Sequence, residues 1–350
     1  MDLCGIAESI RPLDEDMMSL ARRRQDSLTK PRGSLGRLED ISVQLAGIYR
    51  TGRPVIAGKA IFTMAGDHGV TKEGISAYPS DVTAQMVLNF ASGGAAINVL
   101  GRHAGADVIT VDMGVAGENN WPDSIVRSRI RGGTGNLARE NAMTLEQAGT
   151  AVANGIELAR SASSKGYNLI GIGDMGIGNT TSASAITAVV TGQPVRSVTG
   201  LGTGIDSEGF DRKIATIAHA IEFHRPDPED PLDLLSKVGG LEIAGMAGVI
   251  LGAASMDIPV VLDGFISGSS ALIAAALAPN SREYMIASHL SVENGHGAIL
   301  KHIGLEPLLD MRMRLGEGTG AALAMMIIEG ACKVLDEMAT FEEAGVSDRE

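Results

Sequence analysis

The chain has 350 residues, of which 44% are hydrophobic but only 3% aromatic, and its formal net charge is −13. This length supports one large α/β domain, alone or with a small accessory one, while the acidity and the scarcity of aromatic residues argue against a nucleic-acid partner. The acidic N-terminus has no apolar signal core, and the uncharged run 175–195 carries too many polar residues for a membrane helix. Cys4 and Cys332 share no CxxC spacing and indicate two free thiols. We therefore expect a cytoplasmic protein with no membrane partner.

Predicted strands and helices alternate along most of the chain. Helix-compatible stretches occupy residues 82–103, 145–165 and 241–256. The short, β-prone apolar runs between them end abruptly in glycine or polar residues and lie at 60–65, 108–111, 168–172, 260–262 and 284–287. This alternation predicts an α/β fold with a Rossmann-like, doubly wound parallel sheet.

The two ends of the chain are predicted to be helical, at residues 12–49 and 320–338, without a strand between helix and terminus. We expect them to meet in a small helical domain built from residues 1–55 and 318–350. Residues 56–317 then form the large α/β catalytic domain.

Polar residues follow several of the expected strands. In doubly wound folds, ligands bind beyond the carboxyl ends of the strands, so these residues predict a site at that rim. The residues in question are Asp67, His68, Asp174, Asn179, Asp263, Ser288 and Ser291.

Two glycine-rich segments could approach a ligand closely. GIGDMGIGNTT, residues 171–181, offers glycines and polar side chains at a helix start, and SVTGLGTGID, residues 197–206, could cradle a phosphate or ribose. Each also fits a simpler interpretation, a strand-to-helix turn and a flexible connection. Neither is a GxGxxG or Walker loop.

MRLGEGTGAALA, residues 313–324, places Glu317 between two glycines just before an apolar helix. A carboxylate fixed in such a loop can reach a ligand, because its neighbours leave room for one. The alternative is an acidic residue favoured at a helix start by the helix dipole.

The remaining charged motifs predict little. Asp67 with His68, and His289 with Glu293, lack further residues at ligand spacing, so we expect no metal and no cofactor. KPRGSLGRLE, residues 30–39, could clamp an anion or simply break a helix. The paired-acid loop of diphosphate-using phosphoribosyltransferases is missing from the sequence.

Taken together, the motifs resemble those of the nicotinate-nucleotide–dimethylbenzimidazole phosphoribosyltransferases. The resemblance covers about residues 28–335 and is most specific at MRLGEGTGAALA. It is carried, in the family's order, by KPRGSLGRLE, AGDHGVTKEGISAYPSDVTAQMV, NFASGGAAINVL, GIGDMGIGNTTSAS, LSKVGGLEIAGMAG, LDGFIS, SHLS and MRLGEGTGAALA.

The resemblance implies transfer of ribose phosphate from nicotinate mononucleotide to a benzimidazole-type base by a homodimer, without a metal. Glu317 is implied as the general base, with Asp174 as a second catalytic residue where some members carry glutamate. The implied base-binding residues are Tyr78, Gln85, Met86, Met175 and Leu315. The implied nucleotide-binding residues are Gly176, Gly178, Asn179, Thr180, Gly202, Thr203, Lys213, Gly264 and Ser291.

Two other classes of protein share some of these features. A dinucleotide-dependent oxidoreductase would need an acidic residue at the end of a second strand after GxGxxG, which the sequence lacks. A non-catalytic nucleotide-binding protein would keep the fold without the chemistry. Release of nicotinate from nicotinate mononucleotide in the presence of a base separates the three classes.

Overall fold

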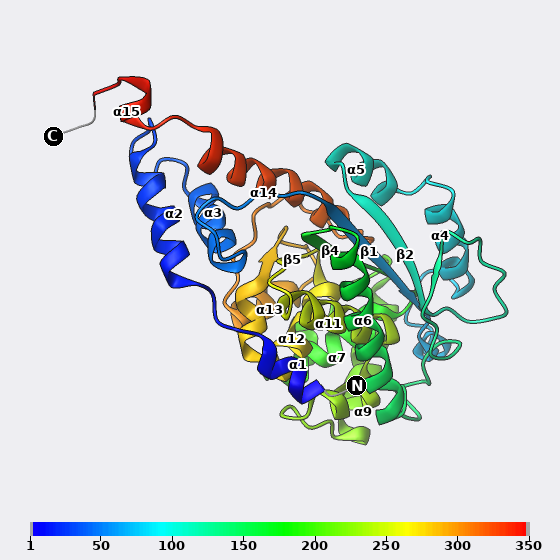
Figure 1. Ribbon diagram of the computed structural model, residues 1–350. Helices are drawn as coiled ribbons and strands as arrows, with labels where there is room; N and C mark the ends of the chain where they lie inside the picture. Colours follow the sequence, from blue (N-terminus) through cyan, green and yellow to red (C-terminus); the bar gives the residue numbers. More distant parts are fainter. Residues whose placement is uncertain (1–2, 348–350) are drawn as a thin grey trace.

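A single parallel sheet forms the centre of the computed structural model, which describes residues 3–347 (Figure 1). Its strands follow the order β3-β2-β1-β4-β5-β6, and every neighbouring pair is parallel. This is the doubly wound order of the Rossmann fold, so the predicted fold class is confirmed. The strands are β1 (Lys59–Gly66), β2 (Asp107–Gly114), β3 (Val126–Arg127), β4 (Leu169–Met175), β5 (Val260–Leu262) and β6 (Met285–Ala287).

Helices cover both faces of the sheet, as the sequence of strands and helices predicts. One face carries α6 (Leu145–Ser164), α11 (Leu241–Ala254) and α12 (Phe265–Leu277), and the other is covered chiefly by α14 (Thr319–Glu337). The helices α6 and α11 cross closely at glycines: a Cβ added to Gly155 would lie 2.0 Å from the carbonyl oxygen of Gly245. The outer helices are α7 (Asn179–Thr191), α8 (Val195–Val198), α9 (Ser207–His224), α10 (Pro231–Val238) and α13 (His296–Ile303), with 3₁₀ helices at Gly69–Glu73 and Pro279–Tyr284.

The helix predicted over residues 82–103 is wrong in one respect, because it is two helices. α4 (Asp81–Ala91) ends before Gly93, whose φ of 77° takes the chain out of the helix, and α5 (Ala96–Ala104) starts anew. The break creates a second helix N-terminus, which faces Glu317. The two-residue strand β3 was not predicted from the sequence, because a run this short has no periodicity to detect.

The two ends of the described chain meet. α2 (Glu15–Ser27) and α3 (Arg37–Ile48) pack together and against α14, and Leu28 forms an antiparallel bridge with Thr340 just before α15 (Phe341–Ala344). α1 (Leu3–Ser9) packs against α11 instead. The boundaries at residues 55 and 318 stay a prediction, and residues 1–2 and 348–350 lie outside the described residues.

The motif KPRGSLGRLE is the loop between α2 and α3. Lys30 is buried and donates to Glu39 Oε1 at 2.7 Å, while Arg37 pairs with Glu306. Lys30 therefore lowers the pKa of Glu39, although burial opposes this shift. These charges are used within the protein, which favours the loop interpretation over an anion clamp.

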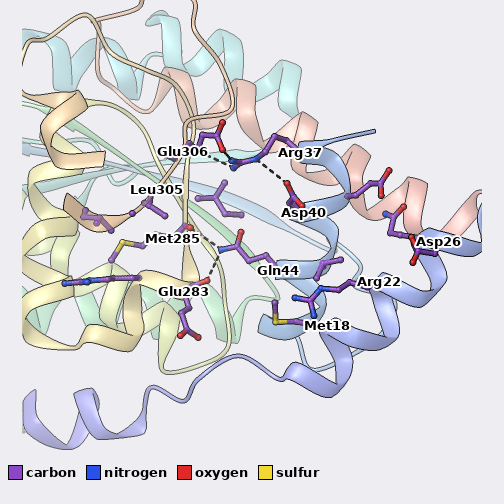
Figure 2. Close-up of a pocket in the computed structure, with 18 residues that line it drawn as sticks. Met18, Arg22, Asp26, Arg37, Asp40, Gln44, Glu283, Met285, Leu305 and Glu306 are labelled. Atoms are coloured by element: carbon purple, nitrogen blue, oxygen red, sulfur yellow. Dashed lines mark hydrogen bonds and ion pairs between the residues drawn. The ribbon is translucent and has the colours of Figure 1, made fainter. Parts of the chain in front are cut away.

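A groove of about 700 Å³ separates α2 and α3 from β6, the edge strand of the sheet (Figure 2). Gln44 Nε2 donates to the carbonyl oxygens of Glu283 and Met285, at 2.9 and 3.3 Å, and so covers part of the strand edge. The groove is larger than the cleft at the carboxyl ends of the strands. It is not lined by any of the predicted site residues, and part of its polar lining is satisfied internally.

Candidate active site

The candidate active site is a cleft at the carboxyl ends of the strands. It opens where the loops after β1 and β4 separate, and it has a volume of about 530 Å³. Doubly wound folds bind ligands at this switch point. The predicted site residues that line the cleft are Tyr78, Met86, Asp174, Met175, Gly176, Gly178, Asn179, Thr180, Gly202, Thr203, Gly264, Ser291, Leu315 and Glu317.

The loop that carries Glu317 has an unusual backbone. Gly316, Glu317 and Gly318 have φ values of 85°, 64° and 99°. This left-handed conformation is open to glycine but strained for glutamate, and such strain concentrates at functional sites. Glu317 N–H donates to the carbonyl of Asp174 at 3.1 Å, and Thr63 Oγ1 donates to the carbonyl of Glu317 at 2.8 Å. Two central strands therefore hold the glutamate in this conformation.

The Glu317 carboxylate is shielded from solvent but not isolated. Glu317 is only 5% exposed. Its Oε2 accepts a hydrogen bond at 3.2 Å from the N–H of Ile97, which lies in the first turn of α5. Burial raises the pKa of Glu317 above its ordinary value, and the bond from Ile97 partly opposes that shift. A carboxylate of this kind is a stronger proton acceptor than one in water.

Asp174 lies beside Glu317 in a different electrostatic environment. Burial raises the pKa of Asp174 well above its ordinary value, and the carboxylates of Asp263, Glu242 and Glu317 act in the same direction. Asn179 Nδ2, which donates to Asp174 Oδ2 at 2.8 Å, opposes them. Asp174 therefore keeps its proton to a higher pH than an ordinary aspartic acid.

Asp263 fixes the helix that begins directly after Glu317. Its Oδ2 accepts from Gly318 N–H at 3.0 Å, and its Oδ1 accepts from Gly320 and Ala321 N–H at 2.6 and 3.3 Å. Burial raises the pKa of Asp263 to about 7, although these three donors favour the ionised form. The sequence places Asp263 on the rim but does not reveal this anchoring role, since its partners lie 55 to 58 residues further along the chain.

Two helix N-termini also line the cleft. α7 and α12 both begin there, and neither start has a side-chain cap from the residues that the structure describes. Gly178 and Gly264 occupy the N-cap positions. At the start of α7, the N–H groups of Asn179 and Thr181 donate to the carbonyls of Gly176 and Gly178, at 3.1 and 3.0 Å. The positive ends of the two helix dipoles still favour an anion such as a phosphate.

Lys213 and Gln85 are the two site residues implied by the family resemblance that do not line the cleft. The rim residues predicted from the strand ends that do not line it are Asp67, His68, Asp263 and Ser288. Lys213 lies beneath it, where Nζ donates to Thr180 Oγ1 at 2.8 Å and to the carbonyl of Gly200 at 3.2 Å. Burial lowers the pKa of Lys213 to about 8, while Glu293 favours its charged form. Gln85 is exposed on α4, on a different face from Met86, which lines the cleft.

Of the residues considered as metal ligands, Asp67 and His68 make protein contacts, whereas His289 Nδ1 and Glu293 Oε2 are buried without a hydrogen-bond partner among the described residues. Asp67 Oδ2 accepts from Ala116 N–H at 2.8 Å, and both ring nitrogens of His68 contact the side chains of Glu242 and Ser182. Within residues 3–347, no group of three or more His, Cys, Asp or Glu residues has the arrangement of a metal site. No helix in that range is long and apolar enough to cross a membrane.

Several cleft residues could not be identified from sequence motifs. Ile97 contributes only its backbone N–H, which any residue could supply. Arg314 Nη1 donates to the carbonyl of Gly202 at 3.0 Å and so joins the Glu317 loop to the second glycine-rich loop. The other lining residues are Ile75, Ser76, Val82, Ile177, Phe265, Ile266, His289, Glu293 and Gly316.

The fold and the cleft define a nucleotide-binding α/β enzyme of the Rossmann-like class, with a buried acid and two helix N-termini lining the cleft. A family model described as phosphoribosyltransferase matches residues 10–346. The chain belongs to the family of nicotinate-nucleotide–dimethylbenzimidazole phosphoribosyltransferases, as its 57% identity over the whole length of a relative of that name shows.

Relatives of that name are similar over nearly their whole length. The protein of Chloroflexus aurantiacus is 57% identical over 350 residues, covering 100% of both chains, and that of Geobacter sp. strain M21 is 53% identical over 338 residues, covering 97% of each. The crystal structure of CobT from Thermus thermophilus superposes with a TM-score of 0.92 at 45% identity, covering 95% of this chain and 100% of that one.

The raised pKa of Glu317 predicts the acidic limb of the pH–rate profile. A base must be deprotonated, so kcat/KM should fall as the pH drops through the pKa of Glu317, at a midpoint above the ordinary 4.5. The profile should be measured with the parent and with Glu317→Gln, because titration of the substrates contributes equally to both. An identical acidic limb in the two proteins would contradict the assignment.

Proposed function

We propose that this protein transfers the phosphoribosyl group of nicotinate mononucleotide to 5,6-dimethylbenzimidazole or a related base. The products are α-ribazole phosphate and nicotinate. The observation that carries the proposal is that a strained, buried glutamate and two helix N-termini without side-chain caps line one cleft. The glutamate suits a base that must lose a proton, and the helix N-termini suit a phosphate.

In the proposed reaction, the positively charged ring nitrogen of nicotinate mononucleotide becomes neutral as nicotinate leaves. The departure of nicotinate therefore needs no general acid. The incoming base attacks the ribose carbon through its unprotonated ring nitrogen, and its other N–H becomes acidic as the bond forms. Glu317 accepts that proton, a role that typically contributes ~10²–10⁴-fold to the rate. Attack opposite the leaving ring converts the β-nucleotide into an α-riboside.

The remaining acceleration is assigned to the positioning of base and sugar in line. We place the nucleotide phosphate at the starts of α7 and α12, with Lys213 as a buried charge beneath them. The other predicted nucleotide contacts keep the roles assigned to them from the family resemblance. Asp174 is proposed to support the reaction in its protonated form, as its raised pKa favours.

The base is proposed to lie between Tyr78, Met86, Met175 and Leu315, which line the same cleft as Glu317. Gln85 would reach this pocket only after a change of conformation, since it is exposed and lies outside the lining. Methionine is unbranched and adaptable, so the pocket should accept bases that differ by a methyl or hydroxyl group.

This pocket predicts modest discrimination among benzimidazoles. A missing methyl in an apolar pocket usually costs only ~1–3 kcal/mol, whereas bases without an acidic ring N–H leave Glu317 nothing to deprotonate. Competition among dimethylbenzimidazole, benzimidazole, a hydroxybenzimidazole and adenine should show preference for the benzimidazoles. Met86→Ala should alter the ranking, while Leu88→Ala, on the exposed face of the same helix, should not. Preference for adenine, or equal rankings for the parent and Met86→Ala, would show that the pocket is misplaced.

Activity should survive exhaustive EDTA treatment, because the donor has no diphosphate for a metal to bridge. The measurement is the rate of nicotinate release before and after chelation. Loss of activity that one divalent metal restores would make Asp67 and His68 candidate ligands.

We also propose that the protein acts as a cytoplasmic homodimer with a small helical domain. The proposal rests on the family resemblance, and light scattering of the purified protein tests the oligomeric state. The function itself is tested by incubating the protein with nicotinate mononucleotide, with and without a benzimidazole. Release of nicotinate that requires the base supports transfer, whereas binding without release would favour a silent nucleotide-binding protein.

A further inference from the structure

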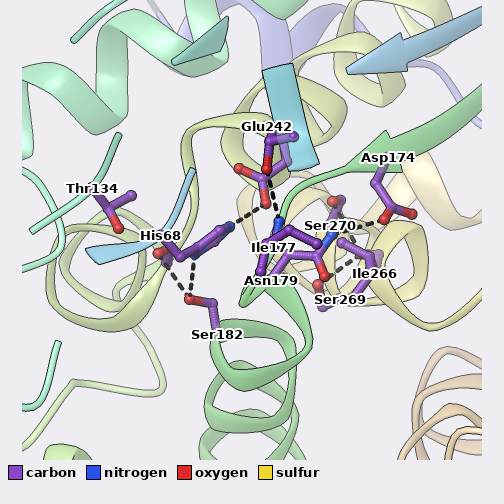
Figure 3. Close-up of polar contacts among 12 residues, drawn as sticks. His68, Thr134, Asp174, Ile177, Asn179, Ser182, Glu242, Ile266, Ser269 and Ser270 are labelled. Carbon is purple, nitrogen blue, oxygen red and sulfur yellow. Dashed lines mark hydrogen bonds and ion pairs between the residues drawn. The ribbon is translucent and has the colours of Figure 1, made fainter. Parts of the chain in front are cut away.

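A buried polar pair lies directly behind the nucleotide end of the cleft, and the proposed reaction does not use it. His68 follows β1, and Glu242 lies in the first turn of α11 (Figure 3). Nε2 of the histidine is 2.6 Å from Glu242 Oε1, and both side chains are 0% exposed. The other ring nitrogen, Nδ1, is 3.0 Å from Ser182 Oγ. A pair held this closely without solvent has a fixed geometry.

The proton arrangement follows from the neighbouring bonds. Ser182 Oγ donates to the carbonyl of Gly239 at 3.2 Å, so it offers a lone pair to His68, and Nδ1–H is the donor to it. Glu242 Oε1 lies within hydrogen-bond distance of Nε2, whereas its Oε2 is buried without a partner among the described residues.

The histidine ring is wedged between two segments of backbone. A Cβ added to Gly178 would lie 3.2 Å from His68 Cβ, and one added to Gly176 would lie 3.6 Å from His68 Cδ2. On the far side, a Cβ added to Gly240 would lie only 2.6 Å from His68 Cε1. The ring therefore fills the space between the nucleotide loop and the start of α11.

Ser182 links the same pair to α7. It lies one turn inside that helix, whose uncapped N-terminus faces the cleft. The contacts of His68 thus connect three elements, namely the end of β1, the start of α7 and the start of α11. A shift of the ring would move the helix start and the glycine loop together.

We propose that His68, Glu242 and Ser182 form a positioning cluster for the nucleotide. The cluster fixes the position of the 176–180 loop and of the α7 N-terminus in the cleft. It therefore governs binding of the phosphoribosyl donor and not of the base. This inference rests on the proposed function and extends it to residues that touch neither substrate.

The first test compares two buried serines of the same helix. Ser182→Ala removes the partner of His68, whereas Ser184→Ala removes a buried hydroxyl whose bond, 3.1 Å to the carbonyl of Val198, lies outside the cluster. Loss of one buried hydrogen bond corresponds to roughly a fivefold effect. We expect KM for nicotinate mononucleotide to rise about that much in Ser182→Ala alone, with KM for the base unchanged in both. Equal KM values for the nucleotide in the two variants would overturn the proposal.

The second test varies Glu242. Glu242→Gln keeps the shape and can donate its amide N–H to Nε2 of a neutral His68, so it should retain a KM for the nucleotide close to that of the parent. Glu242→Ala should raise that KM about tenfold or more, because it leaves the buried Nε2 of His68 without a hydrogen-bond partner. If Glu242→Ala does not fold, the comparison of Ser182→Ala with Ser184→Ala tests the proposal. Parallel rises in KM for nucleotide and base, or failure of the glutamine to rescue, would reject a positioning role. If the parent protein itself releases no nicotinate, the result contradicts the proposed function and not the role of the cluster alone.

Discussion

Glu317→Gln is expected to lower turnover at least ~10-fold, toward the ~10²–10⁴-fold that a general base contributes, while leaving nucleotide binding largely intact. The amide oxygen can still accept the hydrogen bond from Ile97 N–H, and the backbone bonds to Asp174 and Thr63 do not involve the side chain. The loop should therefore keep its conformation. What the glutamine cannot do is accept a proton.

The measurement is steady-state kcat together with the KM for nicotinate mononucleotide. Glu306→Gln is a suitable control, since Glu306 pairs with Arg37 and lies outside the cleft lining. Turnover of Glu317→Gln within twofold of the parent would remove Glu317 from the chemistry.

Gly173→Ala should damage both stability and activity, because the loop that carries Glu317 rests directly on this strand residue. A Cβ at position 173 would lie 2.0 Å from Gly318 N and 2.3 Å from the carbonyl carbon of Glu317. Both are backbone atoms, so the whole loop must move. Overpacking of this kind typically costs ~1–3 kcal/mol in unfolding free energy. Displacing a catalytic group by about 1 Å can cost ~10²-fold in rate.

Gly149→Ala provides the matched control. Gly149 lies within α6, and an added Cβ there meets nothing within 4 Å. Alanine is favoured over glycine in a helix, so this variant should be neutral or stabilised by up to ~1 kcal/mol. Denaturant unfolding and kcat measured on both variants test the prediction. A Gly173→Ala protein as stable and active as Gly149→Ala would contradict the packing of the loop on β4.

The order of strands and helices could be predicted from the sequence because buried parallel strands are short apolar runs with sharp ends. The runs at 60–65 and 260–262 fall within or coincide with β1 and β5. The boundaries of the helices could be predicted less well from the sequence. The pair α4 and α5 reads as one amphipathic stretch, and only the left-handed Gly93 separates them.

The candidate site was partly predictable for a similar reason. Residues that follow strands meet at one edge of a parallel sheet, so Asp174 and Ser291 could be placed together from their positions in the chain. Contacts made through backbone atoms could not be found this way. The donor to Glu317 is the N–H of Ile97, and the anchors of α14 are the N–H groups that Asp263 binds, for which the side chains give no signal.

The most direct test of the central claim is to identify both products of one reaction. The protein should be incubated with nicotinate mononucleotide and 5,6-dimethylbenzimidazole, and the products separated by chromatography and analysed by NMR. We predict nicotinate and a benzimidazole riboside phosphate in equal amounts, with the riboside in the α configuration. Absence of nicotinate release, or a riboside that retains the β configuration, would contradict the account.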